Sequence, residues 1–268
     1  MSKGVIFSGM QPSGRFHLGN YMGALENWIR LQNDYDCVFS IVDLHALTSS
    51  YDDTSKLQDN VREMAIDWLS AGLNPEKNII FVQSHVKEHA ELCLLLGMST
   101  PLSWLERVPT YKDKIANLGS QGKDMHTYGF LGYPVLMAAD IMLYHANYVP
   151  VGEDQAAHLE LTREIIRRFH TLYNCNIFPE FQPVYSKAKV LPGIDGRKMS
   201  KSYGNTIPFG ASPEEVTARI NQMVTDKTRI RKTDPGHPED CVVFKFQQVF
   251  NTEEASTIEA RCKAGDIG

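Results

Sequence analysis

The chain has 268 residues, of which 43% are hydrophobic, enough to bury a sizeable core in one large domain with a smaller second piece. No run of about twenty apolar residues is present, which excludes a membrane-spanning helix and predicts no membrane partner. The formal net charge of −5 neither supports nor excludes RNA binding, and an RNA partner would have to be met by a local basic patch.

The cysteines and the first residues predict a cytoplasmic protein. Ser2-Lys3-Gly4 leads directly into a short apolar run, so we expect no signal peptide. The cysteine count is odd and no CxxC is present, which predicts reduced thiols. The five cysteines are Cys37, Cys93, Cys175, Cys241 and Cys262.

A glycine-rich loop follows the first expected strand. Val5-Ile6-Phe7-Ser8 is of strand type, residues 9–20 contain three glycines, and a helical pattern runs from Tyr21 to Leu31. A strand, a glycine-rich loop and a helix start are typical of an anion cradle. The spacing fits neither a P-loop nor the fingerprint of a hydride-transfer cofactor, so neither is indicated.

Strands and helices then alternate. We expect a second strand over 37–42, a helix over 60–73 and a third strand over 78–82. This alternation predicts an α/β fold, a doubly wound parallel sheet of Rossmann-like type. His45 follows the second strand, at an edge where ligands of such sheets bind. It could equally be a ligand contact or a hydrogen-bonded loop histidine.

The alternation lapses between residues 84 and 132, which we interpret as a helical insertion. Helical runs are expected over 89–97 and 102–107, followed by a Gly/Lys-rich loop over 117–124. Lys112 and Lys114 lie beside that loop. They could contact RNA phosphate, but a solvated face is the favoured interpretation.

A helix with one buried carboxylate is expected over 133–144. Pro134 suits its first turn, and Asp140 lies among apolar residues of the sequence. The carboxylate could cap buried backbone N–H groups. Alternatively, it is the acceptor of an apolar pocket for one N–H donor, which would reject rings that lack the donor. A short strand over 148–151, a turn over 152–155 and a long amphipathic helix follow.

The stretch from Gly196 to Asn205 contains two lysines three residues apart, two serines and flanking glycines. Lysine charges at this spacing suit a polyphosphate, although a solvated basic turn has the same composition. The glycine-rich loop near the N-terminus supplies a second phosphate element and favours the polyphosphate. Further helices are expected from Ser212, over 242–250 and over 253–262. We place the domain boundary between a catalytic domain over 1–195 and a helical domain over 196–268.

Four segments resemble a known family. His17-Leu18-Gly19-Asn20 resembles the HIGH signature of class I aminoacyl-tRNA synthetases, and Lys198-Met199-Ser200-Lys201-Ser202 matches their KMSKS signature letter for letter. The helix over 133–144 and the Gly152-Glu153-Asp154-Gln155 turn resemble those of bacterial tryptophanyl-tRNA synthetases.

The resemblance implies activation of L-tryptophan with ATP, followed by transfer of tryptophan to tRNA(Trp). It also implies Mg²⁺ bound through the ATP phosphates, without a protein metal site, and a homodimer formed through the insertion. Such enzymes continue beyond Gly268 with helices that bind the anticodon. We therefore expect a C-terminally short chain, in which the transfer step is doubtful.

The resemblance also implies site residues. Those expected to contact ATP are Gln11, Ser13, Gly14, His17, Gly19, Asn20, Gly152, Asp154, Lys198, Met199, Ser200, Lys201 and Ser202. Those expected to contact tryptophan are Phe7, Gln11, His45, Tyr133, Met137, Asp140, Val149, Val151 and Gln155. The residues expected to assist catalysis are Gln11, His17, Asn20, Lys198, Ser200 and Lys201.

Three other functions fit part of the pattern. A small-molecule adenylyltransferase could share the first loop, a catalytically silent relative could bind tryptophan or RNA, and a tyrosine-specific enzyme would share both signatures. Cys241 and Cys262 are spaced like two cysteines of an iron–sulfur site found in some relatives. Two thiols do not hold such a cluster, so two unrelated cysteines are the favoured interpretation.

Overall fold

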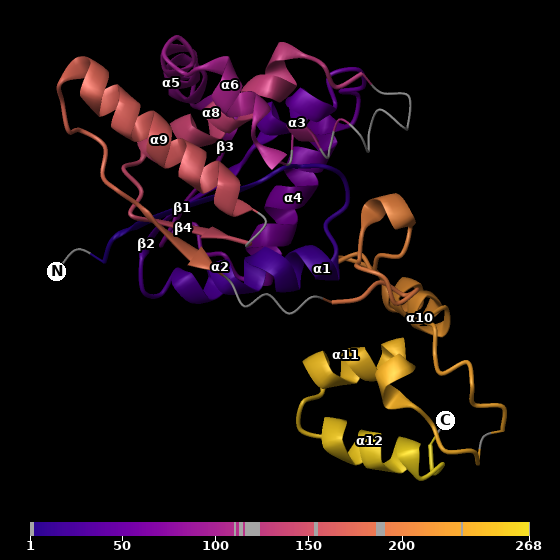
Figure 1. Cartoon of the computed structure of the whole chain (residues 1–268). Coiled ribbons are helices and arrows are strands. Elements are labelled where there is room, and N and C mark those ends of the chain that lie inside the picture. Colours follow the sequence, from indigo (N-terminus) through magenta and orange to yellow (C-terminus); the bar gives the residue numbers. More distant parts are fainter. Residues whose placement is uncertain are drawn as a thin grey trace. The chain divides into compact units, whose positions relative to one another are not determined.

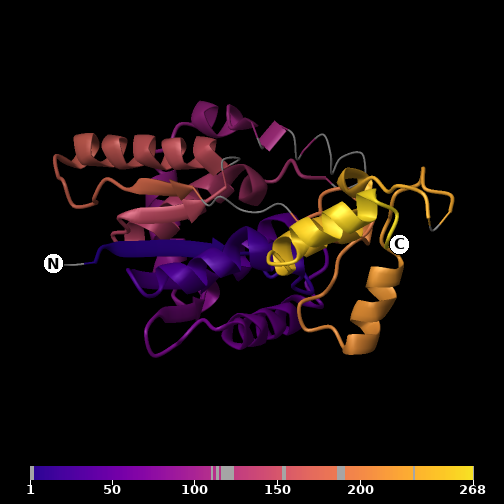
Figure 2. The ribbon, with the colours of Figure 1, turned by 90° about the horizontal axis from the view of Figure 1, so that it is seen from below.

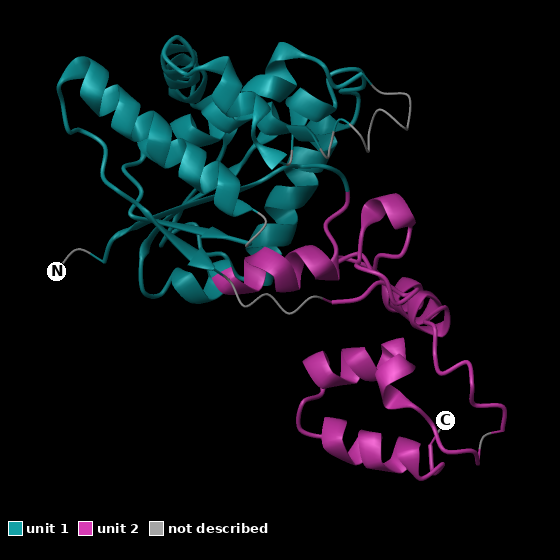
Figure 3. Ribbon diagram, viewed as in Figure 1, with its two compact units in different colours: residues 1–14, 28–186 teal, residues 15–27, 187–268 magenta. Residues whose placement is uncertain are grey.

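The computed structural model describes residues 3–109, 111, 112, 115, 124–152, 155–185, 191–231 and 233–267. The chain forms two compact units, shown in different colours in Figure 3. Unit 1 consists of residues 1–14 and 28–186, and unit 2 of residues 15–27 and 187–268. The division differs from the boundary expected after residue 195, because the segment 15–27 packs with the C-terminal part of the chain.

Unit 1 contains a five-stranded sheet in the order β3-β2-β1-β4-β5, in which all pairs are parallel. The strands are β1 (Val5–Met10), β2 (Asp36–Ile41), β3 (Ile79–Val82), β4 (Tyr148–Val151) and β5 (Gln182–Tyr185). This topology confirms the predicted doubly wound α/β fold. Strand order reverses at β1, whose neighbours are β2 and β4, and ligands of open parallel sheets bind at such a switch point.

Helices cover both faces of the sheet, as Figures 1 and 2 show. Phe7 and Val38 are register partners on one face and share a core with the helices of the second half of unit 1. On the other face Phe39 stacks on Trp28, whose ring lies edge-on to Trp68. The helices of the first face are α5 (Glu88–Gly97), α6 (Leu102–Glu106), α8 (Tyr128–Leu143) and α9 (Ala156–Tyr173). Those of the second face are α2 (Glu26–Leu31) and α4 (Leu57–Ala71).

Helix α8 begins five residues earlier than the sequence analysis expected, and that expectation is wrong. The hydroxyl of Thr127 caps the helix by accepting a hydrogen bond from the backbone N–H of Phe130 (3.2 Å). Pro134 consequently lies inside the helix rather than in its first turn. The cap makes the helix long enough for Phe130, Tyr133 and Asp140 to be buried along it.

Unit 2 begins with three short helical segments in the order α1 (Leu18–Asn20), the π-helical η1 (Tyr21–Leu25) and the first residues of α2. Its later elements are the 3-10 turn η4 (Lys201–Tyr203), α10 (Pro213–Asn221), η5 (Pro238–Asp240), α11 (Val242–Phe250) and α12 (Ala255–Lys263). Met22 shares a core with Leu191 and Met199, which joins the early segment to the late loop. Within the ranges that the structure describes, no helix has the length and apolar character needed to cross a membrane.

Candidate functional site

In unit 2 the HIGH-like motif forms the start of α1. The Nδ1 of His17 accepts a hydrogen bond from the backbone N–H of Asn20 (3.3 Å), and the Asn20 side-chain oxygen accepts one from the backbone N–H of His17 (3.3 Å). This reciprocal capping box fixes both side chains at the helix start. The backbone N–H of Leu18 also donates to the carbonyl of Ile207 (3.0 Å), just after the lysine loop.

The lysine loop (residues 191–205) lies directly against α1. The backbone N–H of Gly19 points at the sulfur of Met199 (3.2 Å), and Met199 is buried. A Cβ on Gly19 would lie 3.0 Å from His17 Nδ1 and 3.2 Å from the Cβ of Met199. Only glycine therefore fits here without displacing a neighbour, and the two signature motifs meet inside one compact unit.

The pKa of His17 is lowered where the HIGH-like helix start meets the lysine loop. Burial, with a contribution from the charge of Lys201, lowers the pKa of His17 to about 4. The imidazole is therefore neutral at neutral pH. Because its Nδ1 accepts from Asn20, the neutral ring carries its proton on Nε2 and has one N–H to donate to a ligand.

Asn205 holds the lysine loop in shape, and the sequence analysis did not identify it as a site residue. Its side-chain oxygen accepts a hydrogen bond from the backbone N–H of Ser200 (2.8 Å). Its amide nitrogen donates to the carboxylate of Asp195 (2.8 Å) and to the carbonyl of Lys198 (3.2 Å). The only hint in the sequence was its place directly after Gly204, whose φ of 62° lies in the left-handed region that favours glycine.

The side chains of the loop differ in exposure. Lys198 and Ser202 are exposed, Ser200 and Lys201 are half-buried, and the hydroxyls of the two serines lie 2.8 Å apart. Lys198 and Lys201 thus lie on a loop that the hydrogen bonds of Asn205 hold in place. The loop lies next to the start of α1, where His17 offers its Nε2–H as a donor. This arrangement can hold the oxygens of a polyphosphate.

The first half of the glycine-rich loop belongs to unit 1. Gln11 and Ser13 line a cavity of about 140 Å³ beneath the turn that Gly14 completes at a φ of 108°. The remaining lining comes from the end of α3 (Asp43–Ser49), the connection that follows it and the start of α4. These residues are Ala46, Leu47, Ser49, Ser50, Asp53, Thr54, Lys56, Leu57 and Asn60, and Pro12 of the glycine-rich loop completes the lining.

Asp140 is buried in unit 1, but its surroundings are not apolar, contrary to the expectation from its sequence neighbours. Its Oδ2 lies 2.9 Å from His45 Nε2, and its Oδ1 lies 2.7 Å from Gln83 Nε2 and 2.6 Å from His89 Nδ1. Burial alone would raise the pKa of Asp140, but the hydrogen bonds from His45 and His89 outweigh burial and hold the pKa below its ordinary value. The carboxylate is therefore ionised at neutral pH.

The other expected tryptophan contacts surround the same region of unit 1. Phe7 stacks on Tyr144 with ring centroids 5.4 Å apart, and the Tyr133 hydroxyl lies 2.6 Å from His158 Nε2. The ring of Tyr133 lies edge-on to that of His45, at 6.4 Å. The structure places three further expected residues, Met137, Val149 and Val151, in the Phe7 core.

Gly152 and Gln155 both precede α9, and Gln155 is its N-cap residue. Asp154 lies outside the described residues, as do Lys114 and most of the expected loop over 117–124. Cys241 and Cys262 are free thiols in unit 2. Among the residues that the structure describes, no group of three or more His, Cys, Asp or Glu side chains could hold a metal ion.

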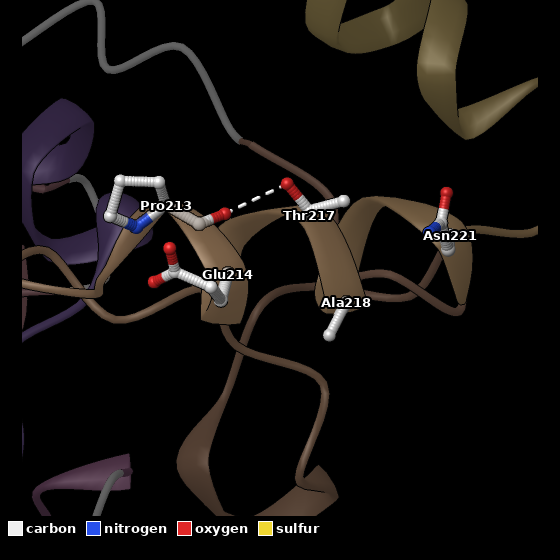
Figure 4. Close-up of a pocket in the computed structure, with 5 residues that line it drawn as sticks. All are labelled: Pro213, Glu214, Thr217, Ala218 and Asn221. Carbon is white, nitrogen blue, oxygen red and sulfur yellow. Dashed lines mark hydrogen bonds between the residues drawn. The ribbon is translucent and has the colours of Figure 1, made fainter.

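A second hollow, of about 410 Å³, lies along α10 (Figure 4). Its five lining residues all come from that helix, and the Thr217 hydroxyl donates to the backbone carbonyl of Pro213 (2.8 Å). None of the expected site residues lines this hollow.

Comparisons with known proteins identify the family. Residues 2–268 match the family model described as "tRNA synthetases class I (W and Y)". The tryptophan--tRNA ligase of Thermotoga maritima is 51% identical over 266 residues, covering 98% of this chain and 80% of the relative. The Aquifex aeolicus enzyme of the same name is 42% identical, covering 98% and 84%.

A solved structure agrees with these relatives. The tryptophanyl-tRNA synthetase of Campylobacter jejuni, crystallised with ADP and tryptophan, superimposes with a TM-score of 0.89 at 37% identity, covering 98% of this chain and 81% of that one. The chain therefore belongs to the class I tRNA synthetases for tryptophan and tyrosine, as an enzyme of the bacterial tryptophanyl type.

Proposed function

We propose that this enzyme activates L-tryptophan with ATP. The tryptophan carboxylate oxygen forms a bond to the α-phosphorus as the bond from that phosphorus to the bridging oxygen of the β-phosphate breaks. The products are tryptophanyl adenylate and pyrophosphate. The observation that carries the proposal is the packing of Met199 against Gly19, which brings the KMSKS loop against the HIGH-like helix start. Catalysis then consists of positioning and charge stabilisation.

Residues of unit 2 hold the phosphates. Lys198 and Lys201 stabilise the charge that develops on the leaving pyrophosphate, with Ser200 and Ser202 as hydroxyl donors. Neutral His17 donates from Nε2 without adding a positive charge, and Gly19 lets adenosine approach the backbone closely. Asn20 completes this group by holding His17 in its donating tautomer.

Gln11, Ser13 and Gly14 of unit 1 contribute further phosphate contacts, and Gly152 and Asp154 contribute contacts to adenosine. The support for Gln11 and Ser13 is the cavity that both side chains line. Mg²⁺ enters on the ATP phosphates, as is usual where this ion accompanies a nucleotide. When bound, the ion neutralises part of the phosphate charge.

Asp140 accepts the indole N–H of tryptophan. An ionised carboxylate has about four acceptor positions. Three are filled by Gln83, His89 and His45, and the fourth remains on Oδ2. One acceptor position matches the one N–H of an indole. Phe7, Tyr133, Met137, Val149 and Val151 line the ring pocket, and Gln11 and Gln155 lie toward the polar end of the amino acid. His45, which the sequence placed at that end, instead contacts the Oδ2 that accepts the indole N–H.

We further propose transfer of tryptophan to tRNA(Trp) as the second step, tested by aminoacylation of that tRNA. A homodimer is supported by exposed apolar side chains in and beside α5, α6 and α8. These are Leu94, Leu95, Met98, Leu102 and Tyr128. A cytoplasmic location is proposed from the five free thiols.

Tryptophan-dependent ATP–pyrophosphate exchange tests the first step. Lys198→Ala and Lys201→Ala should each slow exchange at least about a hundredfold, as is typical for loss of a group that stabilises transition-state charge. Tryptophan binding, measured by equilibrium dialysis, should stay within about threefold. Lys227→Ala, which removes an exposed lysine of the same unit, is the matched control and should change neither quantity.

Each rival function predicts a different result. Exchange that ignores tryptophan would indicate a small-molecule adenylyltransferase, and faster exchange with tyrosine would indicate the sister specificity. Binding of tryptophan without exchange would indicate a silent relative. Near-normal exchange in both lysine variants would refute the role given to the loop.

A further inference from the structure

The donors around Asp140 come from three separate elements of unit 1. Gln83 belongs to the 3-10 turn η2 (Gln83–His85), His89 to α5 and His45 to α3. Gln83 and His89 both donate to Oδ1, whereas His45 alone contacts Oδ2. Because the donors approach from different directions, the plane of the carboxylate is fixed. One oxygen is saturated and the other retains an open acceptor position.

Tyr144 contacts the second ring nitrogen of His89. Its hydroxyl lies 2.8 Å from His89 Nε2. The ionised carboxylate of Asp140 only accepts hydrogen bonds, so His89 Nδ1 carries the ring hydrogen and donates it to Oδ1. Nε2 of the neutral ring is then an acceptor, and the Tyr144 hydroxyl, whose pKa is raised to about 12 by burial and by the charges of Asp140 and Glu88, donates to it. Tyr144, His89 and Asp140 form a one-directional chain of hydrogen bonds.

The described network leaves buried acceptors unfilled. The side-chain oxygen of Gln83 is buried and has no hydrogen-bond partner among the residues that the structure describes, although its amide nitrogen donates to Asp140. The free position on Asp140 Oδ2 is the second unfilled acceptor. Of these two acceptors, only the position on Oδ2 belongs to an ionised group, so it is the stronger acceptor for a donor that a ligand supplies.

We propose that Gln83 and His89 are positioning residues for substrate selection: by saturating Oδ1 of Asp140 they direct its single open acceptor position, on Oδ2, to the N–H of the substrate ring. Tyr144 supports this by holding His89 in the donating tautomer. The inference rests on the proposed function of Asp140. It adds that the selectivity of this carboxylate depends on Gln83 and His89, which donate to the oxygen that does not contact the substrate.

The test compares tryptophan with its analogue 3-(benzothiophen-3-yl)alanine, in which sulfur replaces the ring N–H. The ratio of kcat/KM for the two amino acids in ATP–pyrophosphate exchange measures recognition of the N–H. His89→Leu should lower this ratio at least about tenfold, mainly through KM for tryptophan, because the carboxylate is no longer held. His89→Asn keeps one N–H donor and should restore most of the ratio.

Tyr144→Phe is the mildest variant, because it retains the ring stacked on Phe7 and removes only the hydroxyl. It should lower the ratio about threefold to fivefold while leaving the thermal midpoint nearly unchanged, as expected for loss of one indirect hydrogen bond. This variant decides the question if His89→Leu does not fold. Gln83→Met, which removes the amide at similar volume, should lower the ratio about as much as His89→Leu.

His170→Leu is the matched control. His170 lies on α9, where its Nε2 accepts a hydrogen bond from the backbone N–H of Phe178 (3.2 Å) and its ring stacks on Phe178. This variant should lose stability and keep the wild-type ratio. If wild-type protein shows no tryptophan-dependent exchange, the proposed function fails. If wild-type protein discriminates and the Tyr144 and Gln83 variants keep its ratio, the inference alone is overturned.

Discussion

Two glycines four residues apart provide a direct test of the packing between the signature motifs. A Cβ on Gly19 would meet His17 Nδ1 at 3.0 Å and the Cβ of Met199 at 3.2 Å. A Cβ on Gly23, in η1, would meet no atom within 4 Å. Gly19→Ala and Gly23→Ala therefore change the chain in the same way, and only the first strains the contact with the lysine loop.

The expected magnitudes follow from this difference. Each substitution should gain about 0.5–1 kcal/mol in free energy of unfolding, because alanine loses less backbone entropy than glycine in a helical segment. Overpacking at Gly19 should cost about 1–3 kcal/mol, since the Cβ of Met199 belongs to a buried residue that cannot simply rotate away. The gain is common to both variants, so their free energies of unfolding should differ by about 1–3 kcal/mol.

Urea unfolding without ATP measures the packing term, and ATP–pyrophosphate exchange measures its consequence. Gly23→Ala should be as stable as wild type or more stable, with unchanged exchange. Gly19→Ala should be less stable, with slower exchange and a raised KM for ATP. Equal unfolding free energies and equal exchange rates for the two variants would refute the contact between Gly19 and Met199.

Three further predictions concern other parts of the molecule. Asn205→Ala removes three hydrogen bonds within the loop and should slow exchange at least about tenfold, whereas Asn221→Ala, in the exposed hollow of Figure 4, should not. Because the pKa of His17 falls from 6.5 to about 4 on folding, the unfolded chain binds a proton that the folded chain rejects, so stability should fall as the pH drops from 6.5 to 4. His17→Asn keeps a capping oxygen and should flatten this part of the thermal-midpoint profile; an unchanged profile would contradict the assignment. Met98→Glu, at a side chain that is 73% exposed, should convert a dimer into a monomer in light scattering, whereas Ile230→Glu should not; a wild-type monomer would exclude the proposed interface.

The sequence predicted those elements whose local signals agree with their tertiary surroundings. The strand over 148–151 and the helix over 242–250 occur with the expected bounds, and Ser212 caps α10 as expected. In each case the apolar pattern and the flanking residues indicate the same structure. The KMSKS motif was identifiable because it matches letter for letter, and the HIGH-like motif because His17 and Gly19 stand in place and precede it in the expected order.

Features that depend on distant contacts were missed. Strand β5 contains Pro183, which the sequence analysis did not interpret as strand, but the strand pairs on one side with β4 and tolerates a missing N–H at the sheet edge. The partners of Asp140 lie 51 to 95 residues away, so local sequence shows only its apolar neighbours. The role of Asn205 likewise depends on its hydrogen bonds to Asp195, Lys198 and Ser200, which the folded loop brings within reach.

The division of the chain constrains how this protein can be cut. The polypeptide passes between the two units three times, after residues 14, 27 and 186. The apolar residue Met22 is covered by Leu191 and Met199, about 170 positions further along the sequence. A fragment ending at residue 186 would carry an uncovered apolar helical segment near its N-terminus and would be prone to aggregate. Autonomous folding of the sheet unit would require splicing out residues 15–27 and bridging the gap with a designed linker.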